Sequence, residues 1–528
     1  MPSSAVLLLL ALVLGYLKRR RSSTGQQLPP GPPPVPLLGN VRGLDALYPW
    51  RSYTTWAAQY GDIIYTRLLS QDIIVISSEK VARDLLDRRS HNYSSRPASL
   101  MTMNELFGTE FSSIFLPYGD RWRLHRRFFH QALNVNAALT FRPIQMRMAH
   151  DLVKKLLMTP DDFSAHLQAL STSTIMSIMY DYRVKPKDDP VVVGVERAID
   201  IAAREVRPEV AAFVATFPFL KYIPPWFPGA HFSSLALECR QSITKWVDAP
   251  FQHVKQNMEM GSAAPSMVSG ILSRIHDGMH SEQEVAQLEK AVMEASASAY
   301  AAAAETTFST LSIFVLAMIL YPDVQAQAQA EIDSVIGENP TRLPDWEDRE
   351  SLPYVDAVIK ETLRWHPAVP LSIPHATVDD DIYEGYYIPK GSATVLINAW
   401  AMSRDPIKFP EPHTFRPERF LSSEKPSSTA SSSVTAMDEL SFAFGFGRRV
   451  CVGRHVADAS LWISIVNMLS LFRFESVPGW DPGPNGENVK WAGGVTTYPQ
   501  EFPCKITARH QVLNTERLAQ LVESSSAY

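Results

Sequence analysis

Residues 444–453 read Phe-Gly-Phe-Gly-Arg-Arg-Val-Cys-Val-Gly, and this stretch decides how the rest of the chain is interpreted. Three glycines surround one cysteine, Cys451, with two arginines before it and an apolar run over 457–471 after it. Glycine lets backbone fold closely around another group, because it has no side chain in the way and tolerates positive φ. A thiolate is a soft metal ligand, and neighbouring cations favour its deprotonated form. We therefore interpret Cys451 as the axial thiolate of a haem iron. The alternative is a glycine-rich turn before a buried helix, with an incidental core cysteine.

The composition is that of a large globular protein. The chain has 528 residues, of which 45% are hydrophobic, so it can bury a large core. A formal net charge of −5 and the lack of a basic arm give no argument for a nucleic-acid partner. The three cysteines are far apart and odd in number, and no CxxC pair occurs. This pattern argues against a disulfide framework, a zinc ribbon and dithiol redox chemistry, and it fits a reducing compartment.

Residues 1–21 combine an apolar run with a basic flank. Ser3–Leu17 is nearly all apolar, and Lys18–Arg21 follows it. A cleavable signal peptide carries its charge before the apolar run, whereas basic residues after the run hold that side in the cytoplasm. At about 1.5 Å per residue the run spans roughly 22 Å, which is short for a hydrocarbon core of ~30 Å. We predict a membrane anchor with the body of the protein on the cytoplasmic face, rather than a plain core helix.

Residues 22–40 are predicted to form a hinge between this anchor and a catalytic unit over residues 41–528. Leu28–Pro36 holds six prolines in nine residues, which makes a stiff, extended segment with few hydrogen-bond donors. The alternative, a proline-rich ligand for a partner domain, is weaker because anchor and body lie directly on either side.

Several stretches of the body have local sequence patterns that predict strands or loops. Alternation and β-branched residues predict a hairpin over 60–77 and strands over 386–397. Residues 99–116 carry several phenylalanines without clean periodicity, which predicts a loop that lines a pocket. The aromatic, proline-punctuated stretch 217–228 either packs internally or dips into a membrane surface, and we favour the membrane. The serine-rich stretch 422–433 predicts a solvated loop.

A helix is predicted to begin at Asp120. Trp122 and Arg126 are four residues apart and share a face of this helix, so they can jointly hold one anionic group. The alternative is a solvated basic helix face.

The longest predicted helix covers residues 282–321. Ser281 and Glu284 form a capping-box pattern before it, and no glycine or proline occurs until Pro322. At about 1.5 Å per residue this is a rod of roughly 60 Å, longer than an ordinary globular helix.

The centre of that helix predicts a polar notch. Ala301–Ala304 clears space on the helix surface, and Glu305 and Thr306 follow. The Thr306 hydroxyl can donate a hydrogen bond to the carbonyl of Ala302 and so bend the helix locally. An acid beside a hydroxyl in such a notch can pass protons to an iron-bound reactant. The alternative is that alanine simply favours the helix and Glu305 points to solvent.

Glu361 and Arg364 lie three residues apart on a further helix, close enough to pair. The stripe on one face of that helix is formed by Val355, Ile359, Leu363 and His366, and the pair lies off it. Periodicity therefore predicts a surface ion pair that contributes a fraction of a kcal/mol, about 0–1 kcal/mol.

In their order along the chain, these pieces resemble the cytochrome P-450 family, from the anchor to about residue 510. More narrowly, the chain is similar to fungal enzymes of the O-methylsterigmatocystin oxidoreductase type, which serve secondary metabolism. The resemblance implies the cytochrome P-450 fold: mainly α with small β-sheets, a long central helix and an N-terminal membrane anchor helix. The matching pieces are Pro29–Pro36, Trp122–Arg126, Ala302–Thr307, Glu361–Arg364, Pro417–Phe420 and Phe444–Gly453.

The resemblance also implies haem b (iron protoporphyrin IX) as cofactor. Cys451 would be the axial ligand of the iron, with Phe444 and Gly453 shaping the pocket around its sulfur. The residues that would contact the haem propionates are Trp122, Arg126, His375 and Arg449.

Two further groups take roles from the resemblance. Glu305 and Thr306 would be the acid–alcohol pair above the iron. Glu361, Arg364 and Arg419 would form a buried charge cluster, which contradicts the surface pair that periodicity predicts, and we follow the resemblance here.

The chain departs from the family pattern at two positions. Ala303 stands where the family usually has glycine, so we expect a slightly tighter notch. Val452 stands where many relatives have proline, and we expect this change to be tolerated.

The activity implied is that of a haem-thiolate monooxygenase in the endoplasmic reticulum membrane. It would insert one atom of O2 into a small apolar organic substrate, with electrons from NADPH through a cytochrome reductase. The basic run 121–127, with Arg448 and Arg454, would offer an electropositive face to that reductase. The expected substrate-pocket walls are 101–116, 299–303, 369–373 and 493–497.

Two other functions remain open from the sequence. A haem-thiolate isomerase or dehydratase needs no reductase, but it has no use for the Glu305–Thr306 pair. A non-catalytic haem-binding protein needs neither that pair nor a deep pocket.

Overall fold

The structure is a computed structural model that describes residues 27–525, apart from 186–188, 206, 225, 228–230, 392, 422–438 and 511–512. The predicted anchor (1–21) and the serine-rich stretch (422–433) lie outside the described residues.

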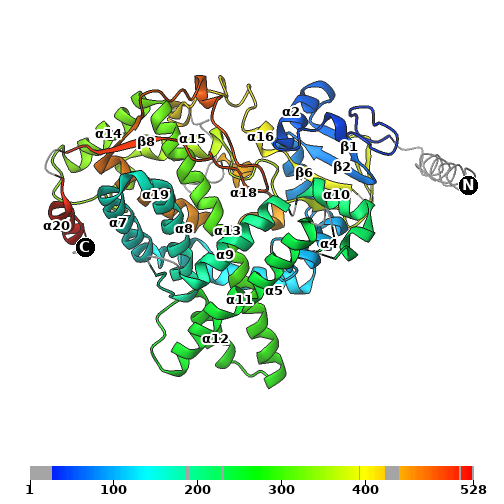
Figure 1. The fold of residues 1–528 in the computed structure, drawn as a ribbon, viewed down its shortest axis with the longest axis horizontal. Coiled ribbons are helices and arrows are strands. Elements are labelled where there is room, and N and C mark those ends of the chain that lie inside the picture. Colours follow the sequence, from blue (N-terminus) through cyan, green and yellow to red (C-terminus); the bar gives the residue numbers. More distant parts are fainter. Residues whose placement is uncertain are drawn as a thin grey trace, which may run out of the picture.

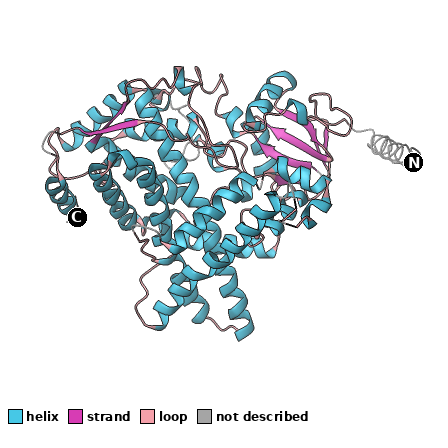
Figure 2. Cartoon of the chain, viewed as in Figure 1, coloured by secondary structure: helices cyan, strands magenta, loops and turns pink. Residues whose placement is uncertain are grey.

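Helices form most of the molecule, with small sheets beside them (Figure 2), so the expected mainly α class is confirmed. The helices are α2 (Pro49–Tyr60), α3 (Glu79–Ala82), α4 (Ala98–Phe107), α5 (Asp120–Leu133), α6 (Val135–Leu139), α7 (Arg142–Met158), α8 (Phe163–Tyr180), α9 (Pro190–Glu205), α10 (Pro208–Thr216), α11 (His231–Glu259), α12 (Met267–His276), α13 (Glu282–Leu320), α14 (Pro322–Ile336), α15 (Pro353–Trp365), α16 (Ala399–Met402), α18 (Ser441–Phe444), α19 (Arg454–Leu471) and α20 (Thr515–Ser525).

The largest sheet lies at the N-terminal end of the molecule, to the right in Figure 1. Its strand order is β1-β2-β6-β3, and β1 (Ile63–Leu68) pairs antiparallel with β2 (Gln71–Ile76), which confirms the predicted hairpin. β2 runs parallel to β6 (Ala393–Ile397), and β3 (His375–Ala376) pairs antiparallel with β6. Two-stranded sheets are formed by β4 (Asp381–Tyr383) with β5 (Tyr386–Ile388), and by β7 (Phe472–Ser476) with β8 (Cys504–Ala508).

Helix α13 crosses the centre of the molecule (Figure 1). Its start is confirmed: the Ser281 hydroxyl accepts from the Glu284 N–H, and the Glu284 carboxylate accepts from the Ser281 N–H at 2.8 Å. It ends at Leu320, before Pro322 begins α14. Among the described helices α13 is long and apolar enough to cross a membrane, but 72% of its apolar window is buried inside the protein. It is therefore the central core helix, packed against α8 and α5.

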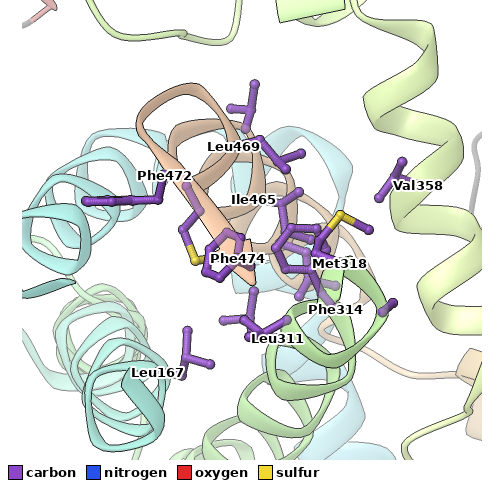
Figure 3. Packing of buried hydrophobic residues seen from close by; sticks show 14 of the residues in the cluster. Leu167, Leu311, Phe314, Met318, Val358, Ile465, Leu469, Phe472 and Phe474 are labelled. Carbon is purple, nitrogen blue, oxygen red and sulfur yellow. The ribbon is translucent and has the colours of Figure 1, made fainter. Parts of the chain in front are cut away.

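The main apolar core lies where the C-terminal half of α13 meets α19, α15 and β7 (Figure 3). Phe314 of α13 and Phe474 of β7 pack edge to face, with ring centroids 6.1 Å apart. Residues 459–471 of α19 are all buried, so the apolar run after the cysteine stretch is a core helix. Because α19 is held on all sides, it gives the cysteine stretch a rigid support.

Residues 99–116 differ from the predicted loop. Their first part is helix α4, which buries Leu100, Met103 and Phe107. These residues lie three and four apart, which is helical spacing. The prediction was wrong here because the phenylalanines after residue 107 obscured this earlier periodicity. The rest of the stretch is irregular and lines a cavity, as expected.

The described part of the proline-rich stretch lies along the body of the protein. The Tyr65 N–H of β1 donates to the Pro30 carbonyl at 2.9 Å, and the Asn40 side chain donates to the Pro32 carbonyl at 3.1 Å. The chain therefore runs extended beside β1 before it enters α2.

The aromatic stretch after α10 lies on the surface. Phe219, Tyr222 and Trp226 are all exposed, with 79% of Trp226 accessible to solvent. The alternative of internal packing is therefore wrong for these side chains.

Candidate active site

A cavity of about 380 Å³ lies against the middle of α13. All four stretches that were expected to form its walls contribute to it. Sequence did not predict the contributions of α9 and α11. Its mainly apolar lining includes Phe111–Phe115, Ile199, Ala202, Trp246, Ala299, Ala302, Val369, Ile373, Val495 and residues of the cysteine stretch.

The cysteine stretch forms one wall of this cavity and has a constrained backbone. The Cys451 N–H donates to the Phe444 carbonyl at 2.8 Å, which closes the stretch into a loop. Gly447 has φ +62°, and a Cβ added there would lie 1.9 Å from the Leu86 carbonyl oxygen. Only glycine fits such a close approach of two backbones. Phe444, Arg449 and Cys451 of this loop line the cavity.

Cys451 lies deep in the protein, but its side chain is exposed through the cavity that it lines. Burial raises the pKa of its thiol, while the backbone N–H of Gly453 and the guanidinium of Arg126 act in the opposite direction. Gly453 is the N-cap residue of α19 and does not line the cavity. It contributes to the site through its backbone N–H, which contacts Cys451. Cys451 forms no disulfide.

Glu305 and Thr306 lie on the α13 wall of the same cavity. The Thr306 hydroxyl donates to the Ala302 carbonyl at 2.8 Å, which confirms the predicted hydrogen bond. Glu305 does not point to bulk solvent: its Oε1 accepts a hydrogen bond of 2.5 Å from the Thr496 hydroxyl. Burial raises the pKa of Glu305 to about 7, and the hydrogen bond from Thr496 opposes that increase. This acid therefore exchanges its proton near neutral pH.

A group of cationic side chains lies at one end of the cavity. Arg449 donates to the carbonyls of Ser94 and Leu116, at 2.9 and 2.7 Å, and its guanidinium carbon lies 4.3 Å from the centre of the Trp122 ring. Arg96 donates to the carbonyls of Ile114 and Pro374.

Two more of the residues predicted to contact the propionates come from other elements. Arg126 of α5 donates to the Val450 carbonyl at 2.7 Å, next to Cys451. His375 of β3 donates through Nδ1 to the Tyr93 carbonyl at 2.8 Å. The fold therefore brings all four predicted propionate contacts, Trp122, Arg126, His375 and Arg449, to this cavity.

Comparison with known proteins decides the family. A sequence model of the cytochrome P-450 family matches residues 29–503. The chain belongs to the cytochrome P-450 family. It is 36% identical to cytochrome P-450 monooxygenase ple1 of Rhodocybe pseudopiperita, over 95% of this chain and 93% of that protein. It is 35% identical to cytochrome P-450 monooxygenase 176 of Postia placenta (98% and 96%), and to cytochrome P-450 monooxygenase COX2 of Coprinopsis cinerea (95% and 93%). The chain is thus a cytochrome P-450 monooxygenase.

Cytochromes P-450 bind haem through a cysteine thiolate, and the charges of this cavity fit that cofactor. Within the described residues, Arg96, Arg126 and Arg449 form no ion pair. Burial lowers the pKa of all three, that of Arg449 to about 9, and it also lowers the pKa of His375. A cation removed from water without a counter-charge costs several kcal/mol. A ligand that brings negative charge, as the two propionates of haem b do, compensates this group of cations.

The Glu361–Arg364 pair of this cytochrome P-450 is buried, so the surface pair predicted by periodicity is wrong. Both side chains are 0% exposed, and the Arg364 Nε lies 2.6 Å from the Glu361 Oε2. Arg419 adds a second contact to the same carboxylate at 3.2 Å. The Arg364 guanidinium also donates to the carbonyls of Ser403 and Pro412. These contacts tie α15 to the chain that leads into the cysteine stretch.

The expectation that Ala303 tightens the notch is wrong. Ala303 is not among the cavity-lining residues, and it packs against the apolar cluster that includes α8. The Ser171 hydroxyl of α8 approaches the carbonyls of Ala303 and Ala304, at 3.2 and 2.6 Å. Its position on the helix turns this residue away from the cavity.

Sequence reasoning missed two polar residues of the site. Arg96 contacts backbone carbonyls that are 18 and 278 residues away, and no motif marks it. Thr496 fell inside a predicted wall, but its bond to Glu305 joins residues 191 positions apart. Local spacing carries no signal for such pairs.

Proposed function

We propose that this cytochrome P-450 hydroxylates or otherwise oxidises a small apolar organic molecule with O2, with Cys451 as the axial ligand of haem b. The observation that carries the proposal is the position of Cys451 on a cavity wall shared with Thr306 and with Arg96, Arg126 and Arg449, which form no ion pair within the described residues. Phe444 and Gly453 would shape the surroundings of the sulfur. Arg126, Arg449, His375 and Trp122, together with Arg96, would hold the propionates.

When bound, haem b supplies the oxidising chemistry by activating O2 with two electrons. The chain supplies binding and proton control. Apolar walls exclude water and orient the substrate, and the Thr306 hydroxyl donates a proton to the bound reactant. Glu305 replaces that proton, because a carboxyl with a pKa of about 7 is protonated in part of the molecules at neutral pH.

The cavity lining supports an apolar substrate, such as a terpenoid, polyketide or aromatic compound of secondary metabolism. Phe111 and Trp246 meet edge to face above the cavity, with ring centroids 6.0 Å apart. Apart from Glu305, the described residues place no carboxylate in the lining. An aromatic and aliphatic surface of this kind binds by burial of apolar area.

We propose an NADPH-dependent cytochrome reductase as the electron donor. A groove of about 190 Å³ beside the cysteine stretch is lined by Arg126, His130, Arg454 and His455, among others. This basic lining suits an acidic partner surface. The run 121–127 contributes less charge than expected, because Arg121 pairs with Glu294 and Arg123 pairs with Asp120.

We also propose that the enzyme is held at the endoplasmic reticulum membrane by residues 1–21, with 22–40 as hinge and 41–528 as the catalytic unit. An exposed apolar surface supports this proposal. It consists of Phe213, Phe217, Phe219, Tyr222, Trp226 and Phe227 near α10, and we call it the aromatic surface. α10 packs against β1, as does the proline-rich stretch that leads to the anchor.

The experiment that tests the proposal is the spectrum of the reduced, carbon-monoxide-bound protein. We expect the red-shifted Soret band of thiolate ligation in the wild type and in Cys504→Ala, and its loss in Cys451→Ala. Cys504 is a suitable control because it is a buried cysteine of β8, outside the cavity lining. NADPH-dependent oxygen uptake with a reductase then separates a monooxygenase from an isomerase or dehydratase. A Cys451→Ala protein that keeps the band would contradict the proposal.

A further inference from the structure

The chain segment 491–499 forms a closed loop over the cavity. Trp491 and Pro499 form a β-bridge, and the Ala492 N–H donates to the Tyr498 carbonyl at 2.8 Å. The Thr497 N–H donates to the carbonyl of Ala368, a cavity-lining residue, at 2.9 Å. These bonds hold the loop in one shape, so the side chains at its tip are presented to the cavity in a fixed position.

Thr496 at the tip of this loop contacts the acid of α13. Its hydroxyl donates to the Glu305 Oε1 at 2.5 Å, and only 7% of Thr496 is exposed. Both residues line the cavity. Because one oxygen of the carboxyl is held by the hydroxyl, the rotation of the carboxyl is restricted.

We infer that Thr496 is a positioning residue for proton transfer, whose hydroxyl holds the Glu305 carboxyl inside the cavity beside Thr306. The inference rests on the proposed monooxygenase function, in which Glu305 supplies protons. Without the hydroxyl the carboxyl is free to turn toward the charges of α9. Thr496 does not itself touch the reacting atoms; it acts through Glu305.

The groups around Glu305 determine how its charge responds to Thr496. Burial raises the pKa of Glu305 to about 7, and the negative charge of Asp200 adds to this increase. The hydrogen bond from Thr496 and the positive charge of Arg204, both of which favour the carboxylate, oppose it. Asp200 and Arg204 pair with each other at 2.6 Å. Burial and the nearby Glu305 raise the pKa of Tyr498, so that phenol stays neutral and adds no charge.

The sign of the expected change follows from the hydrogen bond. A hydroxyl that donates to a carboxylate stabilises the charged form. Removing it therefore raises the pKa of Glu305 further, and the acid keeps its proton to a higher pH. The same change loosens the carboxyl, so fewer protons reach the bound reactant and more electrons are lost as hydrogen peroxide.

The test compares Thr496→Val, which keeps the shape of the side chain, with Thr496→Ser, which keeps the hydroxyl. Infrared difference spectra of the full-length haem-loaded protein, taken between about pH 5 and about pH 9, follow the Glu305 carboxyl, with Glu305→Gln to assign its band. We expect Thr496→Val to move the titration midpoint upward by about one pH unit and Thr496→Ser to leave it near the wild-type value. Hydrogen peroxide released per NADPH should rise in Thr496→Val and not in Thr496→Ser.

Thr497→Val is the matched control. Thr497 is the next residue, is fully buried, and its hydroxyl has no hydrogen-bond partner among the described residues. An unchanged Glu305 midpoint in Thr496→Val, or an equal change in Thr497→Val, overturns the inference. If the Thr496→Val protein does not bind haem, the Glu305 titration midpoint is measured in Thr496→Ala instead. An unchanged midpoint there overturns the inference in the same way. The carbon-monoxide spectrum of the wild type is measured first, so failure of the proposed function is recognised separately.

Discussion

Thr306 and Ser309 make the same hydrogen bond but lie in different surroundings. Each hydroxyl donates to the carbonyl four residues earlier, at 2.8 Å in both cases. Thr306 lines the cavity, whereas Ser309 is fully buried and does not. A hydroxyl on the wall can exchange its bond with a reactant, and a hydroxyl inside the core cannot.

We therefore expect Thr306→Ala to keep haem and substrate binding but to divert electrons to hydrogen peroxide. General acid catalysis of this kind contributes about 10²- to 10⁴-fold, so product formation should fall by at least tenfold. The measurement is product and peroxide formed per NADPH consumed. Ser309→Ala removes an identical helix bond and should leave coupling unchanged. Equal coupling in wild type and Thr306→Ala would contradict the proton role.

Individual residues of the site differ in how well sequence predicts them. The bond from Thr306 to Ala302 is local, so helix geometry alone predicts it, and the structure contains it. The bond from Thr496 to Glu305 exists only because the chain folds a distant loop back over α13. Arg96 is a similar case, since its partners are backbone carbonyls that any sequence has.

At the scale of elements, α15 shows why periodicity misplaced an ion pair. Buried residues occur all around this helix and include Val355, Val358, Glu361 and Arg364. A periodicity argument counts apolar residues and assigns the remaining face to solvent. Here that face meets the segment from Ser403 to Arg419, which supplies carbonyls and a second arginine. The family resemblance predicted the cluster, whereas the spacing of residues alone did not.

Breaking this cluster should destabilise the enzyme strongly. Glu361→Gln leaves Arg364 buried without its counter-charge, a change that typically costs about 3–5 kcal/mol. Lys360→Gln is the matched control: Lys360 pairs with the half-exposed Glu439, and loss of such a pair costs about 1 kcal/mol or less. Urea denaturation followed by circular dichroism measures both, and the haem spectrum reports whether the site is kept. Similar midpoints for the two variants would contradict the structural role of the cluster.

At the scale of the whole molecule, the aromatic surface predicts where the enzyme meets lipid. Trp226 is highly exposed, and an indole ring is stable at a membrane interface. We expect lipids brominated on their acyl chains to quench tryptophan emission of the full-length chain on vesicles, and Trp226→Phe to remove a large part of that quenching. Trp480→Phe is the control, because Trp480 stacks on Phe502 and packs against the main apolar core, so it is not part of the aromatic surface. Equal quenching in the two variants would mean that this surface does not touch the membrane.

The walls of the cavity come from almost the entire chain, from Arg96 to Thr496. During synthesis the N-terminal half, including Trp122 and Arg126, leaves the ribosome long before the loop that carries Thr496. The cysteine stretch and the loop over α13 are also late. A nascent chain therefore has no complete haem pocket, and a chain truncated before Thr496 would retain the central helix but lack the hydroxyl that contacts Glu305.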